Sequence, residues 1–264
     1  MEQHTLLAEG VSSGYDGKRI ISDIRVAVPE HQISVILGAN GCGKSTLLKT
    51  FSRLIKPSKG QVVLDGKAIT SLSSRQVAQV MGLLPQSPVV PEGIKVTDLV
   101  ARGRFPYRRP FKSMTKADYT AIEESLSIMN ITGLADCSVD ELSGGQRQRV
   151  WIALALTQQT DILLLDEPTT FLDIAYQVEI LELLKELNRR RNTTIVMVLH
   201  DINLAARYAD HLYAMKEGRL LAEGTAKEII TPGMMKQMYG LESIVIEDPV
   251  SKTPLVIPQM RQVL

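Results

Sequence analysis

The stretch GANGCGKST, residues 38–46, limits the fold of this chain more than any other part of the sequence. It directly follows the apolar run ISVILG at 33–38. It precedes STLLKTFSRL, in which Leu47, Phe51 and Leu54 share one face of a predicted helix. A strand, a loop of the form G-x-x-x-x-G-K-[ST] and a helix, in this order, are the setting in which backbone N–H groups wrap phosphates. We therefore expect a phosphate-binding loop at the carboxyl end of a buried strand.

Glycines at the two ends of this loop let the backbone bend around a phosphate, and the helix N-terminus adds a favourable field for negative charge. Lys44 can reach the β- and γ-phosphates of a nucleotide, and the Ser45 hydroxyl can bind Mg²⁺. Cys42 is expected to contribute its backbone only, because at its place in the loop only backbone geometry matters, and it lies in no metal-binding spacing. The predicted nucleotide contacts in the loop are Gly38, Ala39, Asn40, Gly41, Cys42, Gly43, Lys44, Ser45 and Thr46.

A second strand end, in ILLLDEP at 162–168, supplies two adjacent carboxylates. Asp166 ends the predicted strand, where it can hold Mg²⁺ near the phosphate loop. Glu167 lies one residue further, where a carboxylate can orient or deprotonate an attacking water. Two acids that merely cap a turn are the alternative. Together with the phosphate loop, the pair predicts nucleotide hydrolysis.

The stretch LSGGQRQRV at 142–150 has the composition of another phosphate cradle, although no strand is predicted before it. Ser143, Gly144 and Gly145 precede a helical pattern, and the N-terminus of that helix suits an anion. On its own the stretch could be a serine cap followed by a glycine turn. One nucleotide seldom needs two cradles, so these residues alone leave the ligand of the second one open.

Strands and helices alternate along much of the chain, which indicates an α/β fold with a parallel sheet. Further buried strands are predicted from DILLLDE at 161–167 and TTIVMVLH at 193–200, and QVEILELLKELNRR at 177–190 has helical spacing. LDG at 64–66 predicts a tight turn in a small N-terminal antiparallel sheet. We read residues 1–264 as one domain. Its α/β core is expected at 1–86 and 150–264, with a helical subdomain inserted at about 87–149.

Charge and hydropathy exclude several classes of protein. The chain has 30 Lys and Arg against 29 Asp and Glu, a net charge of +1, which gives no general attraction to nucleic acid or to an anionic membrane. No apolar run reaches the ~18 residues that span a bilayer, and the N-terminus lacks the features of a signal peptide. Arg and aromatic residues alternate in ARGRFPYRRPFK at 101–112, but no nucleic-acid recognition motif accompanies them. That segment predicts either a surface that meets a partner or a solvated loop.

The phosphate loop, LSGGQ at 142–146 and LLLDEP at 163–168 together resemble the nucleotide-binding subunits of ATP-binding cassette (ABC) transporters, over nearly the whole chain. The resemblance implies a P-loop ATPase that packs head to tail with a second copy. Each ATP would then lie between the phosphate loop of one subunit and the LSGGQ of the other. On this hypothesis Ser143, Gly144, Gly145 and Gln146 contact the nucleotide of the partner.

The resemblance assigns roles to further residues. It implies that Tyr15 stacks on adenine and that Gln86 senses Mg²⁺ and the attacking water. Asp173 would communicate across the dimer, with Phe171 a mild departure from the smaller residues usual before it. His200 would contact the γ-phosphate. The predicted catalytic residues are Glu167, His200, Gln86 and Lys44, and the predicted Mg²⁺ ligands are Ser45, Gln86 and Asp166.

Several stretches resemble the ATPases of iron–siderophore importers in particular, among them LHDINLAARYADH at 199–211 and YGLESIVIEDPVSKTPLVIP at 239–258. The resemblance implies a homodimer at the cytoplasmic face of a bacterial membrane, below a separate permease that receives its cargo from a binding protein. A cobalamin or haem importer is the alternative. A DNA-repair cassette would need a coiled-coil insertion, and no sustained heptads occur. A translation-type cassette protein would carry two cassettes in one chain, whereas this sequence has a single G-x-x-x-x-G-K-[ST] loop.

Overall fold

The computed structural model describes residues 4–86, 91–108, 112–170 and 172–259. The chain divides into two compact units. Unit 1 is Leu72–Thr193, and unit 2 combines Gln3–Ser71 with Thr194–Leu264. The expected start of the helical subdomain at 87, part of the basic segment (109–111) and Phe171 lie outside the described residues.

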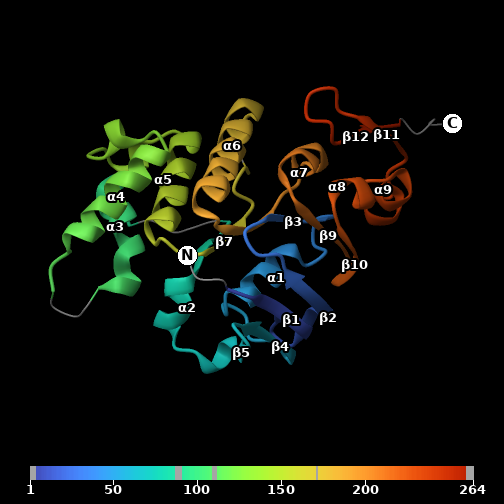
Figure 1. Cartoon of the computed structure of the whole chain (residues 1–264), viewed down its shortest axis with the longest axis horizontal. Helices are drawn as coiled ribbons and strands as arrows, with labels where there is room; N and C mark the ends of the chain where they lie inside the picture. Colours follow the sequence, from blue (N-terminus) through green and yellow to red (C-terminus); the bar gives the residue numbers. More distant parts are fainter. Residues whose placement is uncertain (1–3, 87–90, 109–111, 171, 260–264) are drawn as a thin grey trace. The chain divides into compact units, whose positions relative to one another are not determined.

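Unit 2 contains two β-sheets, a C-terminal hairpin and short helices (Figure 1). Its strands are β1 (Leu6–Tyr15), β2 (Lys18–Val28), β3 (Ile33–Gly38), β4 (Lys59–Leu64), β5 (Lys67–Ala68), β8 (Thr194–Val198), β9 (His211–Lys216), β10 (Arg219–Gly224), β11 (Ser243–Glu247) and β12 (Pro254–Pro258). Its α-helices are α1 (Lys44–Phe51), α7 (Ile202–Tyr208), α8 (Ala226–Ile229) and α9 (Pro232–Tyr239).

The core of unit 2 is formed by β3, which pairs in parallel with both β8 and β9, while β10 adds an antiparallel edge. Every residue of β3 and β8 is buried. A parallel sheet covered on both faces demands such continuous apolar runs, which is why these strands could be predicted without alternation. The prediction of buried strands at 33–38 and 193–200 is confirmed, with β8 slightly shorter than expected.

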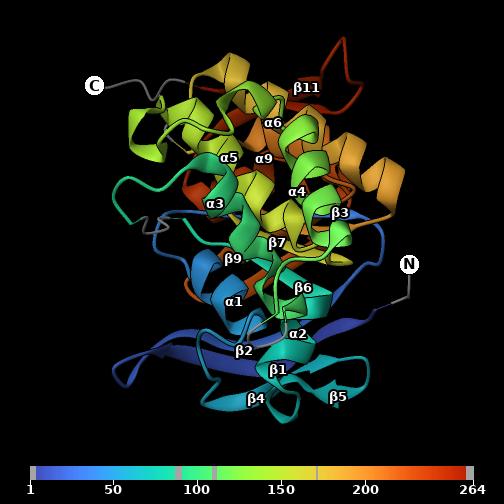
Figure 2. The same ribbon diagram turned by 90° about the vertical axis from the view of Figure 1, so that its left-hand side faces the viewer.

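The N-terminal sheet has the order β2-β1-β4-β5 and is antiparallel throughout (Figure 2). The predicted turn LDG joins β4 to β5, and Asp65 and Gly66 have φ of 52° and 72°. Two consecutive positive φ angles match the twist that a tight hairpin requires. The predicted tight turn in a small antiparallel sheet is therefore confirmed.

Helix α1 is shorter than the sequence pattern predicted. It ends at Phe51, with Ser52 as its C-cap, and Arg53 has a φ of 64°. Leu47 and Phe51 are buried as expected, but Leu54 is 62% exposed, so its predicted place on the same helical face was wrong. The left-handed residue turns the chain before a third apolar contact can form.

Unit 1 contains two parallel strands and most of the long helices. Its strands are β6 (Met81–Leu84) and β7 (Ile162–Asp166), and its α-helices are α2 (Ser74–Val80), α3 (Val96–Ala101), α4 (Lys116–Ile128), α5 (Gly144–Thr157) and α6 (Ile174–Arg191). Helices α3, α4 and α5 pack against one another (Figures 1 and 2). The predicted strand at 161–167 and helix at 177–190 are confirmed as β7 and α6. The division into a core and a subdomain at about 87–149 stays a prediction.

One arginine of the basic segment is part of the interior of unit 1. Arg104, in the 3₁₀ helix Arg102–Tyr107, is only 6% exposed and donates to Asp118 Oδ1 over 2.8 Å. It also donates to the Thr157 carbonyl over 3.0 Å, and its guanidinium lies over the Tyr107 ring. The segment is therefore not simply a charged surface, since Arg104 holds α4 to the end of α5. No helix within the described ranges is long and apolar enough to cross a membrane.

Candidate nucleotide-binding site

The phosphate loop runs from the end of β3 to the start of α1, and Gly38 and Gly43 lie where a side chain cannot fit. Gly38 has a φ of 154°, and a Cβ there would come within 2.3 Å of the Met215 carbonyl oxygen. Gly43 has a φ of 105°, and a Cβ there would lie 2.6 Å from Ile21 Cγ2. The backbone of this loop thus rests directly on β9 and β2, which fixes its curvature.

Lys44 folds back over the loop. Its side chain is buried, and Nζ donates to the carbonyl oxygens of Gly38 over 2.8 Å and Ala39 over 3.2 Å. Helix α1 has Gly43 as its N-cap and therefore no capping side chain. Within the described residues this cation is held by neutral carbonyls, beside a helix N-terminus that no side chain caps, and such a group fits the phosphates of a nucleotide.

Cys42 is anchored through its backbone, as its place in the loop predicted. Its carbonyl oxygen accepts from Gly218 N over 2.9 Å, and the Gly218 carbonyl in turn accepts from Ser22 N over 2.8 Å. Burial raises the pKa of the Cys42 thiol, although the neighbouring Lys44 charge opposes the rise. The thiol is therefore protonated at neutral pH, and the side chain packs as a small apolar group.

In unit 1, β7 ends at Asp166, which is 1% exposed, and Glu167 follows with a φ of 55°. A left-handed backbone is unfavourable for a residue with a side chain and occurs mainly where the surroundings impose it. The turn sends the Glu167 side chain away from the direction that continued strand geometry would give. Strand periodicity could predict that both acids stand at the strand end, but not this turn.

The Glu167 carboxylate is held by two donors. Gln86 Nε2 donates to Glu167 Oε2 over 2.6 Å, and the Thr170 hydroxyl donates to the same oxygen over 2.9 Å. The structure thus brings together two predicted site residues that are 81 positions apart. Thr170 was missed from the sequence, and the only signal for it was its position three residues after Glu167 in a turn.

The second cradle begins α5 and is capped by its own side chains. Ser143 is the N-cap: its Oγ accepts from Gln146 N over 3.3 Å, while Gln146 Oε1 accepts from Ser143 N over 3.0 Å. This is a capping box, so the alternative of a serine cap describes the local structure correctly. Ser143, Gly144 and Gln146 are nevertheless exposed, and the Ser143 hydroxyl can still donate its proton to an anion outside the helix.

The remaining predicted residues lie at the ends of elements. Asp173 is the exposed N-cap of α6 and accepts from Tyr176 N over 3.1 Å. Tyr15 ends β1 and is 45% exposed, as a residue that stacks on a base must be. His200 is exposed two residues after β8. Unit 2 therefore carries the phosphate loop, Tyr15 and His200, while unit 1 carries both acids, Gln86, Ser143 and Asp173. That the two sets act on shared nucleotides stays a prediction.

The chain is similar to proteins of one family. A family model described as "ABC transporter" matches residues 21–170. The ferric enterobactin transport ATP-binding protein FepC of Escherichia coli (strain K12) is 49% identical over 96% of this chain and 93% of its own length.

Two solved structures extend this similarity to the fold. A metal-chelate type ABC transporter in an inward-facing conformation shares 27% identity and a TM-score of 0.84, with all of both chains covered. A dimeric ATP-binding cassette bound to ADP and Pi shares 28% identity and a TM-score of 0.73, covering 83% of this chain and 98% of that one.

Proposed function

Because this chain belongs to the ABC transporter family, we propose that it is the ATP-hydrolysing subunit of a bacterial importer of ferric siderophores. The observation that carries the hydrolytic part is the Glu167 carboxylate, which Gln86 and Thr170 aim from the end of a buried strand. The near full-length similarity to a ferric enterobactin transport protein supports the choice of cargo.

ATP binding begins at the phosphate loop. The β- and γ-phosphates would draw the Lys44 amine away from the Gly38 and Ala39 carbonyls, because an anion is a stronger acceptor than a neutral carbonyl. Tyr15 would stack on the adenine. Ser45, Asp166 and Gln86 are the oxygen donors that would hold Mg²⁺, which supplies charge neutralisation at the phosphates. These donors fit the ion, since hydroxyl, carboxylate and amide oxygens are its preferred ligands.

Hydrolysis requires a water in line with the γ-phosphorus. Glu167 would orient that water and take its proton, while His200 and Lys44 stabilise the charge that develops on the γ-phosphoryl oxygens. The hydrogen bonds from Gln86 and Thr170 hold the Glu167 carboxylate in a fixed orientation at the end of β7. A fixed carboxylate loses little entropy in the transition state, which is why its positioning affects the rate.

The second cradle serves the nucleotide of a second copy. The Ser143 hydroxyl can donate to a γ-phosphate while its oxygen still caps α5, and Gly144, Gly145 and Gln146 add backbone N–H groups at the helix N-terminus. Asp173, at the start of α6, would communicate nucleotide binding from one copy to the other. A homodimer with two shared sites follows, and the dimeric cassette bound to ADP and Pi supports this arrangement.

Two inactive variants test the sharing. Lys44→Ala should lose ATP binding, and Ser143→Arg should bind ATP as a single chain yet fail to hydrolyse it. Mixed in equal amounts, they should regain at most roughly a quarter of the wild-type ATPase rate, because half of randomly assorted dimers are mixed and each has one intact site. A Ser143→Arg chain that loses ATP affinity to the same extent as Lys44→Ala, or a mixture with clearly more than a quarter of the wild-type rate, would show that the cradle does not act on the nucleotide of the partner.

The cargo and the membrane partner complete the proposal. The dimer would work at the cytoplasmic face of the cell membrane, beneath a separate permease that receives a ferric chelate from a binding protein. In this arrangement the ATPase does not touch the cargo, so the cargo must be tested in cells. A strain without this gene should fail to grow on at least one ferric siderophore as sole iron source, and a Glu167→Gln copy should not restore growth. Normal growth on every ferric siderophore, with lost cobalamin or haem uptake, would assign the chain to that sister system instead.

A further inference from the structure

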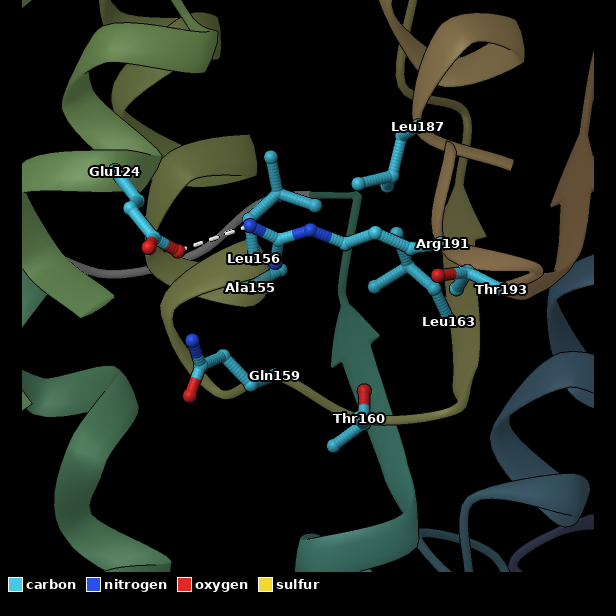
Figure 3. A pocket seen from close by; sticks show the side chains of 9 residues that line it. All are labelled: Glu124, Ala155, Leu156, Gln159, Thr160, Leu163, Leu187, Arg191 and Thr193. Carbon is cyan, nitrogen blue, oxygen red and sulfur yellow. Dashed lines mark hydrogen bonds and ion pairs between the residues drawn. The ribbon is translucent and has the colours of Figure 1, made fainter. Parts of the chain in front are cut away.

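Unit 1 contains a cavity of about 360 Å³ that the nucleotide chemistry does not use (Figure 3). It is formed by the C-terminal ends of α5 and α6, the start of β7 and Glu124 of α4. The cavity lies at the opposite end of α5 from Ser143, and the 14 residues of that helix span ~21 Å. It is therefore separate from the predicted site residues of unit 1.

The walls of the cavity are apolar, and one arginine crosses it. Ala155, Leu156, Leu163 and Leu187 line the sides. In Figure 3 the Arg191 side chain runs through the middle of the cavity toward Glu124, and its Nη2 donates to Glu124 Oε2 over 3.0 Å. This arrangement offers a ligand an apolar surface beside one fixed positive charge.

Hydrogen-bond accounting shows what the ligand must supply. Within the described residues, the single bond to Glu124 is the only one made by the Arg191 guanidinium, which has five N–H donors. Gln159 Oε1 accepts from Arg104 Nη1 over 3.1 Å, and within the same residues its side-chain amide N–H groups have no protein acceptor. Within the described residues, the Thr193 hydroxyl also has no hydrogen-bond partner in the protein. The cavity is thus rich in donors, while Glu124 is its one carboxylate.

A ligand that pairs with these donors must carry hydrogen-bond acceptors. It should also be negatively charged, because a hydrogen bond between an anion and the arginine is stronger than one between neutral groups. The apolar walls favour a hydrocarbon body over a bare inorganic anion. A cation is disfavoured, since α6 ends in Arg189, Arg190 and Arg191, of which the first two already share Glu186. We propose that this cavity binds a small monocarboxylate with a short apolar chain, its carboxylate on Arg191 and Gln159.

The test is calorimetric titration of the full chain with hexanoate, hexanol and hexylammonium. Hexanoate should bind, and the alcohol and the ammonium should bind about tenfold more weakly or not at all, since neither offers a carboxylate to Arg191. Equal binding of all three probes, or no binding of hexanoate, would overturn the proposal.

Two substitutions separate a binding site from general damage to the fold. Arg191→Gln and Glu124→Gln both break the same ion pair, so a purely structural role predicts that both weaken binding. The proposal predicts opposite signs: Arg191→Gln should lower hexanoate affinity by about tenfold, and Glu124→Gln should raise it, because the competing carboxylate is gone. Arg189→Gln is the matched control, since Arg189 lines no part of the cavity and its removal should leave affinity unchanged. Loss of affinity in Glu124→Gln, or in Arg189→Gln to the same extent as Arg191→Gln, would contradict the assignment.

Discussion

At the scale of single residues, the candidate catalytic group depends on local backbone geometry as much as on its chemistry. Glu167 has a left-handed backbone, a conformation that costs on the order of 1–3 kcal/mol and persists only where neighbours impose it. Gln86 and Thr170 then fix one of its carboxylate oxygens. The turn after β7 and two hydrogen bonds, one of them from Gln86 at a distance of 81 positions, therefore act on one side chain. Removing any of them should affect the rate more than the binding of ATP.

Thr170 allows the sharpest test of this view. Thr170→Val removes the hydroxyl that donates to Glu167 and keeps the volume, so kcat should fall about tenfold while KM for ATP stays nearly the same. Thr170→Ser keeps a hydroxyl and should retain most of the rate. Steady-state ATPase assays on the three proteins provide the measurement. A Val variant as active as wild type would show that the bond does not position Glu167.

At this scale the sequence indicated which residues belong to the candidate site, but it did not indicate the hydrogen bonds between them. The phosphate loop, Asp166 and Glu167 could be found because their spacing follows strand and loop geometry. The bonds from Gln86 and Thr170 to Glu167 could not, since one spans 81 positions and the other depends on the turn after β7. Ser143 shows a different limit: the pattern indicated a cradle, and the structure shows a capping box that uses the same residues.

At the scale of secondary-structure elements, the contact between the 3₁₀ helix Arg102–Tyr107 and α4 contains a buried ion pair. Arg104 and Asp118 are 6% and 5% exposed, and their ion pair links the 3₁₀ helix Arg102–Tyr107 to α4. Sequence reasoning treated this arginine as part of a basic surface, because a run of charges gives no sign of which member turns inward. A buried pair also makes stability depend on pH.

Asp118→Asn tests the buried pair. Burial alone would raise the pKa of Asp118, but hydrogen bonds from Arg104 and Thr115 outweigh it and lower the pKa from 3.8 to about 2. A depressed folded pKa contributes stability that is fully present above the unfolded pKa and is lost as pH falls through the folded value. At pH 7 the Asn variant should lose about 3 kcal/mol of unfolding free energy, because Arg104 stays buried without its partner.

The pH dependence distinguishes this cause from a packing defect. The difference between wild type and Asp118→Asn should shrink as pH falls from 3.8 to about 2, the interval over which the wild-type carboxylate takes up its proton. Denaturant unfolding at several pH values measures it. A difference that stays constant over this interval would mean that shape, and not charge, accounts for the loss.

At the scale of the whole molecule, the predicted site residues are divided between two units. Unit 2 is assembled from both ends of the chain. Ser143 and Asp173 are exposed, as the proposed contact with the nucleotide of a second copy requires. We therefore expect ATP to control association: bound between two copies it joins them, and its cleavage releases them.

Glu167→Gln tests this expectation directly. The substitution keeps the volume of the side chain and keeps a carbonyl oxygen for the bonds from Gln86 and Thr170, but it removes the base that takes the proton from water. ATP binding should persist, while hydrolysis should fall by roughly three orders of magnitude. Light scattering coupled to size-exclusion chromatography should then find a dimer with ATP and a monomer with ADP, whereas the wild-type dimer should disappear as ATP is consumed. The double variant Glu167→Gln with Ser143→Arg serves as control and should stay monomeric with ATP, because the cradle for the partner nucleotide is blocked. A Glu167→Gln protein that remains monomeric with saturating ATP, or one that hydrolyses it at the wild-type rate, would contradict the proposed link between the shared site and Glu167.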